Sequence, residues 1–260
     1  MFKREPIREI DGIKVYSEID EYVDNYIKIA SDHVEHYKKY NTNPFMDEAS
    51  WKASESVTLE LINNCCHLNA GTKILDIGVG LGRLLSQIEF GEKNGMDISL
   101  DYLKIAREKG INCIFSKIED MPYEDEYFDL IICTDVLEHV INLYECSEKI
   151  LKALKKGGYF AVRVPYKESL KHYVDDSQYE YVHLRNFDEY SLILHFQKLF
   201  KLKFVDSKFT YFPSPNFGKN IFSKSYRLSR LIYNIHKTIN ISKFVIKYYN
   251  PYEITIIFKK

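Results

Sequence analysis

The sequence predicts a doubly wound α/β fold, in which helices cover both faces of a mostly parallel sheet. From Lys73 onward, short apolar runs alternate with stretches of helical periodicity, which is typical of such a sheet. The first run, KILDI, leads directly into three glycines at alternate positions, Gly78, Gly80 and Gly82. A chain of 260 residues with 45% hydrophobic content can bury one large core and still carry additional segments.

Residues 1–70 are predicted to form a hairpin and a helical cap. IREIDGIKVY contains two short alternating runs around Asp11 and Gly12, which is the turn chemistry of a tight hairpin. Two helices are expected next, over residues 19–40 and 47–66, and the Asn-Pro pair between them breaks the helical pattern.

Residues 71–260 are predicted to form the main domain. Five core strands are expected in KILDI, KNGMD, INCIF, FDLIICT and YFAVRVP, and helices in SLDYLKIAREKG and LYECSEKILKALKKGG. Two closing strands, KLKFVDSKFTYF and YEITIIFKK, flank a predicted helical insertion over residues 213–251. This insertion holds seven Lys and Arg residues and no Asp or Glu. An approximate helical stripe of apolar residues runs through it.

Composition excludes few classes of function. The formal net charge is −1, so global charge favours neither nucleic acid nor a membrane as a partner. The five cysteines show no metal-ligand spacing, and reduced thiols in the cytoplasm are the simplest interpretation. No apolar run approaches the roughly 18 residues needed to span a bilayer, so we expect a soluble protein without stable membrane insertion. The oligomeric state is not indicated.

The glycine turn is suited to a ligand that carries a cation and a ribose. A dinucleotide-binding turn has the pattern G-x-G-x-x-G, whereas the third glycine here comes one residue early. Asp76 stands two residues before Gly78, where its carboxylate would repel a pyrophosphate and favour a cationic group. Asp97 follows at the end of the second strand, where it can accept hydrogen bonds from both ribose hydroxyls.

These residues resemble the class I methyltransferases that use S-adenosylmethionine (SAM). The resemblance rests on D-x-G-x-G-x-G with the acid after it, and then on Met121-Pro122-Tyr123, Phe128-Asp129, VLEHV and GGYFAVRVP. It covers residues 73–212 and the last strand. It implies a Rossmann-like sheet of seven strands whose last strand is antiparallel.

The resemblance also implies which residues hold SAM. Asp76 and the glycine turn would hold the methionine end, Asp97 the ribose, and the segment around Ile118 and Glu119 the adenine edge. Ile98 and Thr134 are carried over as further cofactor-binding residues. This chain departs from the pattern at Lys117, where relatives often have an Asp, so the partner of the adenine amino group stays open.

The segment TDVLEHV is the candidate catalytic motif. If a helix begins where the fourth strand ends, Asp135, Glu138 and His139 share one face of it, and His183 follows the neighbouring fifth strand. Two carboxylates and two imidazoles could bind one divalent cation, Mg²⁺ or Mn²⁺. Small-RNA 2′-O-methyltransferases and ubiquinone-pathway O-methyltransferases are similar, with E-x-x-E-H and a distant His as metal ligands. Asp135 stands here in place of the first Glu.

A metal-free interpretation stays open. Many metal-free relatives also have L-E-H-V at this place, with the Glu capping a helix and the His packed near the site. His139 would then be the general base that removes a proton from an acceptor hydroxyl, with Glu138 beside it.

The sequence predicts O-methylation of a small anionic acceptor, bearing phosphate or sugar. One interpretation of the basic insertion over residues 213–251 is a lid that recruits such an acceptor, and another is docking on an anionic membrane surface. The most common role of such a segment is a helix that packs by its apolar stripe and leaves its lysines in water. RNA 2′-O-methylation is the less favoured alternative, and a catalytically silent SAM-binding partner subunit is another. The only tryptophan, Trp51, either covers the site or anchors the cap.

Overall fold

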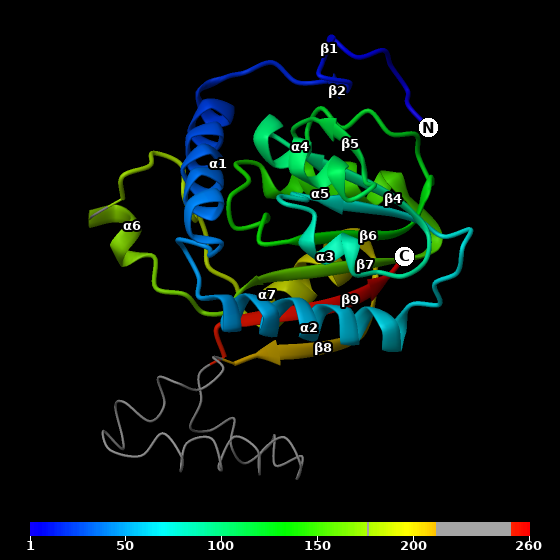
Figure 1. Ribbon diagram of the computed structural model, residues 1–260. Helices are drawn as coiled ribbons and strands as arrows, with labels where there is room; N and C mark the ends of the chain where they lie inside the picture. Colours follow the sequence, from blue (N-terminus) through cyan, green and yellow to red (C-terminus); the bar gives the residue numbers. More distant parts are fainter. Residues whose placement is uncertain (176, 212–250) are drawn as a thin grey trace, which may run out of the picture.

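The computed structural model describes residues 1–175, 177–211 and 251–260, and these form a mixed sheet with helices on both faces (Figure 1). The sheet has nine strands in the order β1-β2-β5-β4-β3-β6-β7-β9-β8. The strands are β1 (Arg8–Ile10), β2 (Ile13–Val15), β3 (Lys73–Ile77), β4 (Glu92–Asp97), β5 (Asn112–Phe115), β6 (Phe128–Thr134), β7 (Leu154–Pro165), β8 (Lys203–Thr210) and β9 (Glu253–Lys259).

The sheet has two more strands than the seven predicted. Strands β3 to β9 are the expected set, and β9 is antiparallel to both of its neighbours, β7 and β8. The additional strands are the N-terminal hairpin, which was assigned to the cap. Its second strand pairs in parallel with β5, with Val15 opposite Phe115. The side chains of Ile13 and Val15 are buried there, so the hairpin extends the core and covers an edge that would otherwise be open.

The two cap helices and the helix after β4 lie where they were predicted. The helix predicted over LYECSEKILKALKKGG ends earlier, at Ala153, because residues 154–158 belong to β7. Within the described part of the chain, no helix directly follows β6, and four short helices were not predicted. The helices are α1 (Glu21–Tyr40), α2 (Glu48–Cys65), α3 (Arg83–Ser86), α4 (Leu100–Glu108), α5 (Leu143–Ala153), α6 (Lys171–Asp175), α7 (Glu189–Leu194) and the π-helix η1 (His195–Leu199). The two cap helices begin at aspartates, because the side chains of Asp20 and Asp47 accept hydrogen bonds from backbone N–H groups of the first turn.

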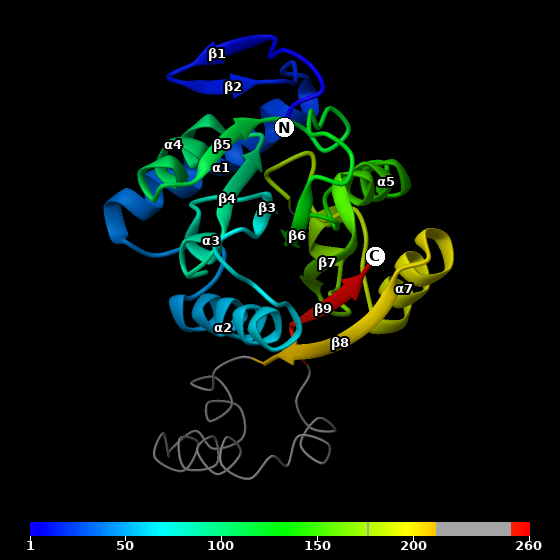
Figure 2. The same ribbon diagram turned by 90° about the vertical axis from the view of Figure 1, so that its right-hand side faces the viewer.

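Helices α2 and α4 lie on one side of the sheet and α5 and α7 on the other (Figure 2), and an apolar cluster packs on each side. One contains Leu61 of α2 and Leu103 of α4, and the other contains Ile150 of α5 and Leu192 of α7. Helices therefore cover both faces, as the alternation of strands and helices predicted. Among the described residues, no helix has the length and apolar character to cross a bilayer.

The parallel arrangement of the central strands positions the site. β3 lies between β4 and β6 and is parallel to both, and β6 is parallel to β7. The carboxyl ends of these strands therefore meet at one edge of the sheet, where ligands bind in folds of this kind. The predicted insertion lies outside the described residues, apart from Pro251.

Candidate active site

A cavity of about 1180 Å³ lies at the carboxyl ends of the parallel strands. Residues of α1, together with Trp51 of α2, line one side of it. Ten of the predicted site residues line it: Gly78, Gly80, Asp97, Ile98, Ile118, Glu119, Asp135, Glu138, His139 and His183. Thr134, Asp76 and Gly82 are not among the lining residues. Thr134 and Asp76 each adjoin one in the sequence, whereas Gly82 packs against α4. The structure therefore brings most of the predicted site residues to one cavity.

The glycine turn after β3 is constrained by close packing on both sides. Gly78 has a φ of 71°, and a Cβ at this position would lie 2.3 Å from Cγ2 of Val136 in the loop after β6. Gly82 has a φ of 69°, and its Cβ would lie 3.1 Å from Cα of Ala106 on α4. Gly78 therefore lets two loops meet at the cavity wall, whereas Gly82 lets the turn pack against a helix.

Two carboxyls, Asp76 buried and Asp97 half-buried, stand at the ends of the adjacent strands β3 and β4. Asp76 is 2% exposed, and its Oδ1 has no hydrogen-bond partner within the described residues. Burial raises the pKa of Asp76 to about 8, against the opposing charge of Arg163. Asp97 accepts hydrogen bonds from the backbone N–H groups of Gly80 (2.9 Å) and Ser99 (3.0 Å), yet burial raises its pKa to about 6.

Lys117 anchors the cap to the loop after β5. Its Nζ lies 2.6 Å from Oδ2 of Asp20, the N-cap residue of α1, and its backbone N–H donates to Oγ of Ser17. The lysine that replaces the expected acid therefore ties α1 to the segment with Ile118 and Glu119. The partner of an adenine amino group is not identified by these contacts.

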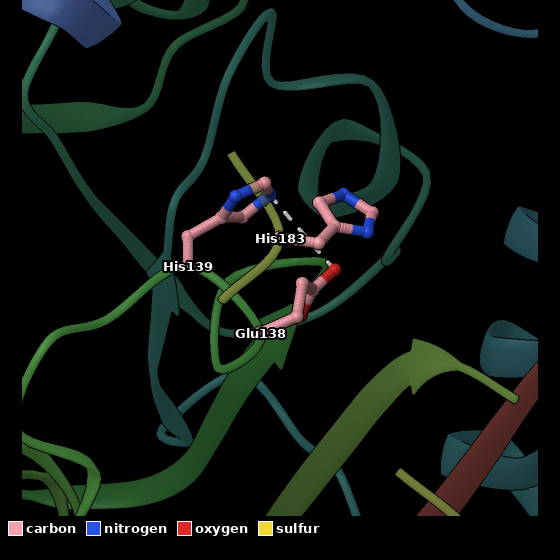
Figure 3. Close-up of side chains that lie close together, drawn as sticks. All are labelled: Glu138, His139 and His183. Carbon is pink, nitrogen blue, oxygen red and sulfur yellow. Dashed lines mark ion pairs between the residues drawn. The ribbon is translucent and has the colours of Figure 1, made fainter. Parts of the chain in front are cut away.

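Glu138, His139 and His183 form a compact cluster in the cavity wall (Figure 3). One potential ligand atom from each residue lies within 4.8 Å of the other two. Glu138 is 1% exposed, and neither of its carboxyl oxygens has a hydrogen-bond partner within the described residues. Burial raises the pKa of Glu138 well above its usual range. Burying a carboxyl without a hydrogen-bond partner costs folding free energy, and a bound ligand or cation would offset that cost.

The two imidazoles of this cluster are held by residues that the sequence did not reveal. Nδ1 of His139 lies 3.0 Å from the hydroxyl of Tyr26 on α1, and Nδ1 of His183 is hydrogen-bonded to the carboxylate of Glu168. Each ring therefore keeps Nε2 for another partner, and Nε2 of His139 lies 4.0 Å from Oε1 of Glu138. Burial, together with the neighbouring imidazole of His183, lowers the pKa of His139 to about 3, so the ring is neutral.

Asp135 does not join the cluster, and the helix predicted to bring it there is wrong. Residues 135–140 form a turn, closed by a hydrogen bond from the N–H of His139 to the carbonyl of Val136. Asp135 has a φ of 57°, and its carboxylate forms an ion pair with the buried Arg163 on β7. The same guanidinium lies 3.4 Å from Glu253 of β9, whose pKa burial raises to about 7.

Tyr26, Glu168 and Arg163 were not predicted as residues of the site. Tyr26 is 113 positions from His139, and Glu168 is 15 from His183, so no local spacing connects them. Arg163 lies within the predicted strand YFAVRVP, where a charged residue in an apolar run was the one available signal.

The residues present fit a SAM-type cofactor and a divalent cation. The unpartnered Oδ1 of Asp76 and the close approach of the turn at Gly78 suit a ligand that carries an ammonium group. A buried carboxyl close to two imidazoles, each hydrogen-bonded through Nδ1 to a second residue, is a set of donors that could hold a divalent cation such as Mn²⁺.

Comparisons with known proteins agree with this geometry. Residues 68–209, more than half of the chain, match the family described as "Methyltransferase domain". An uncharacterised protein of Methanocaldococcus jannaschii is 39% identical over 95 residues, which cover 36% of this chain and 45% of that protein. Phosphoethanolamine N-methyltransferase 2 of Caenorhabditis elegans is 34% identical over 110 residues, covering 38% of this chain and 25% of the relative.

The fold is shared with solved structures at lower identity. A SAM-dependent methyltransferase of Thermotoga maritima, described as a possible histamine N-methyltransferase, has a TM-score of 0.59 and 17% identity over 92% of this chain and 99% of that one. The matched stretch spans less than half the length of the two curated relatives above. The family match over more than half of the chain identifies it as a member of the methyltransferase domain family, whose enzymes use SAM.

Proposed function

We propose that this chain transfers the methyl group of SAM to an oxygen atom of a small-molecule acceptor, assisted by a divalent cation bound to Glu138, His139 and His183. The observation that carries the proposal is the buried carboxylate of Glu138, which has no hydrogen-bond partner within the described residues and faces two imidazoles. Asp135, which was predicted as a fourth ligand, is left out because Arg163 occupies its carboxylate.

The cofactor would lie across the ends of β3 and β4. SAM supplies a methyl group that its sulfonium already activates, so the protein mainly has to orient an acceptor in line with the breaking bond. Asp97 would accept hydrogen bonds from the ribose hydroxyls, and Asp76 would offer a carboxylate to the methionine ammonium. The Asp76 proton must leave before the ammonium binds, because its pKa is raised to about 8.

The cation would lie beside the cofactor, at the loop after β6. A bound divalent cation lowers the pKa of a hydroxyl that it contacts, which favours the nucleophilic alkoxide. Tyr26 and Glu168 hold the two imidazole rings through Nδ1, which would leave both Nε2 atoms available to the cation. Without a cation, the neutral His139 would itself accept the hydroxyl proton, and its bond to Tyr26 would hold the ring in position.

The size of the cavity favours a small acceptor. Ligand pockets usually enclose about 300–1,000 Å³, and the 1180 Å³ here leaves room for a metabolite beside SAM. The predicted anionic character of the acceptor depends on the basic insertion, which lies outside the described residues. RNA 2′-O-methylation and a silent SAM-binding subunit stay as alternatives. N-methylation is a further alternative, favoured by the relative named as a phosphoethanolamine N-methyltransferase.

A methyl-transfer screen tests the proposal. The purified chain is stripped with a chelator and supplied with labelled SAM and panels of hydroxyl, phosphorylated, amine and short-RNA acceptors, with and without Mg²⁺ or Mn²⁺. We expect an O-methylated small molecule whose formation requires the cation. Turnover that is unchanged after chelation would reject the cation, and methylation of amines or RNA alone would reject the acceptor class.

The affinity for the cofactor product, S-adenosylhomocysteine (SAH), is expected to rise with pH. Below its raised pKa of about 8, Asp76 holds a proton that binding of the ammonium must displace. Affinity should therefore increase by up to about tenfold per pH unit between about pH 6 and 8, and level off above. Calorimetry of the wild type and of Asp76→Asn measures this, and the variant should show a flat profile. A wild-type affinity independent of pH would contradict the role given to Asp76.

A further inference from the structure

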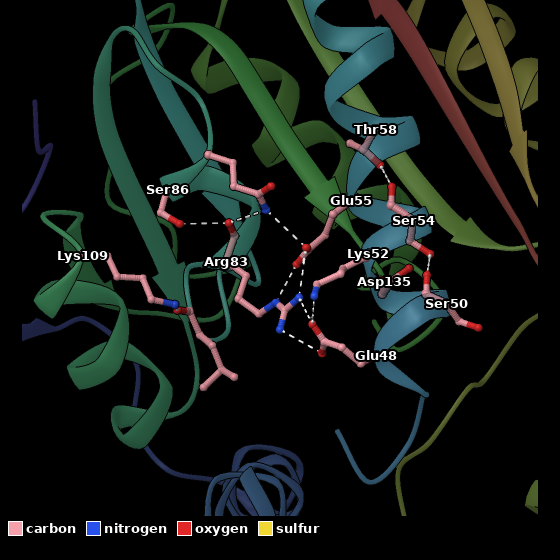
Figure 4. Close-up of polar contacts among 12 residues, drawn as sticks. Glu48, Ser50, Lys52, Ser54, Glu55, Thr58, Arg83, Ser86, Lys109 and Asp135 are labelled. Atoms are coloured by element: carbon pink, nitrogen blue, oxygen red, sulfur yellow. Dashed lines mark hydrogen bonds and ion pairs between the residues drawn. The ribbon is translucent and has the colours of Figure 1, made fainter. Parts of the chain in front are cut away.

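Arg83 connects the cap helix α2 to the cofactor turn through a dense set of polar contacts (Figure 4). Its guanidinium donates to Glu55 at 2.8 and 3.2 Å and to Glu48 at 3.2 Å through two nitrogens. The Arg83 side chain is only 17% exposed and that of Glu55 is 6% exposed, so this is a largely desolvated pair of charges. We call Arg83, Glu48 and Glu55 the Arg83 clamp.

The clamp also holds the single tryptophan of the chain. The guanidinium carbon of Arg83 lies 3.7 Å from the centroid of the Trp51 ring, which is a close cation–π contact. Trp51 is half-buried and is one of the residues that line the cavity. A tryptophan that only anchored the cap to the core would not need to reach the cavity.

The neighbours of Trp51 place it at the cofactor end of the cavity. Arg83 directly follows Gly82, the last glycine of the turn after β3. On the other side, the ring of His33 lies 5.8 Å from that of Trp51, and Nδ1 of His33 lies 2.6 Å from the hydroxyl of Tyr102. Tyr102 belongs to the first turn of α4, directly after β4. Trp51 therefore lies between the segments that follow the two cofactor-binding strands.

We propose that Trp51 contacts the bound cofactor and that the Arg83 clamp holds Trp51 in position. Cofactor binding and the docking of α2 on the glycine turn would then stabilise each other. The apolar ring would cover the ligand and exclude water from its cationic end, while the clamp fixes the ring at little entropic cost to binding. This inference requires cofactor binding alone, and it is independent of the acceptor and of the cation proposed above.

The single tryptophan provides a direct test on the full wild-type chain. Because the sequence has one Trp, all indole emission reports this position. Titration with SAH, without acceptor or metal, should change the emission in a saturable way, with a dissociation constant within about twofold of the calorimetric value. Trp51→Phe serves as the optical blank and should bind SAH more weakly. Calorimetric binding of SAH with unchanged indole emission would overturn the proposal.

The clamp is tested with Arg83→Gln and with a control substitution on α2, the helix that carries Glu48 and Glu55. Glu60→Gln removes the Glu60–Lys208 pair, in which the Glu60 side chain is 57% exposed, and should leave the affinity for SAH unchanged. Arg83→Gln should weaken SAH binding by about tenfold, or about 1.4 kcal/mol, and raise KM for SAM but not for the acceptor. An Arg83→Gln protein that is less stable yet binds SAH normally would show that the clamp is only structural, and would overturn its positioning role.

Discussion

Replacing Glu138 with glutamine is expected to lower kcat/KM by about a thousandfold while leaving the free energy of unfolding unchanged within about 1 kcal/mol. The carboxyl is buried and has no hydrogen-bond partner within the described residues, and burial raises its pKa well above the usual range, which favours the neutral form in the absence of a cation. An amide of the same shape therefore costs little stability. It cannot supply the anionic oxygen that a divalent cation requires.

A large loss of activity without a loss of stability would indicate that the carboxylate serves function and not folding. Steady-state kinetics, urea denaturation and Mn²⁺ binding should be compared for wild type, Glu138→Gln and the control Glu148→Gln. Glu148 lies on the neighbouring helix α5 and forms an exposed pair with Lys152, so its substitution should change none of the three. If Glu138→Gln stays fully active, or if it unfolds several kcal/mol more easily, the role assigned to Glu138 is wrong.

Replacing Gly78 with alanine is expected to destabilise the protein by about 2–5 kcal/mol, from left-handed backbone strain and overpacking together. The new methyl group would lie 2.3 Å from Cγ2 of Val136, and a β-branched side chain has little freedom to move aside. The loop that carries Glu138 and His139 begins at this contact, so its displacement should weaken both SAH binding and the cation site.

Gly110 offers a matched control for the backbone strain. It has a φ of 79°, close to the 71° of Gly78, but a Cβ there would have nothing within 4 Å. Gly110→Ala should therefore cost only about 1–2 kcal/mol and leave SAH affinity unchanged. Urea denaturation and SAH calorimetry measure both variants. Equal losses of stability at the two glycines would contradict the close packing of the cofactor turn against the loop after β6.

The parts of the site that follow local rules were predictable from the sequence. The glycine turn and the acids at the ends of β3 and β4 are tied to single strand ends, so spacing alone locates Gly78, Asp76 and Asp97. The nine-stranded sheet was not predictable, because the pairing of β2 with β5 joins segments about 100 positions apart. Local patterns carry little information about such pairings.

The proposed metal ligands show which part of the site local sequence patterns could not predict. Glu138, His139 and His183 do lie together, but the helical spacing used to group the first two with Asp135 is not how the structure does it. The next helix begins at Leu143, where Asn142 caps it, and the residues before it form a turn. The left-handed conformation of Asp135 then directs its carboxylate away from the cluster, toward a partner on β7.

The central claim, a divalent cation among Glu138, His139 and His183, is tested most directly by anomalous diffraction from crystals grown with Mn²⁺ and SAH. We predict one strong anomalous peak within coordination distance of the Glu138 carboxylate and the Nε2 atoms of both histidines. A cavity that contains SAH but shows no peak at these three side chains under saturating Mn²⁺ would contradict the account.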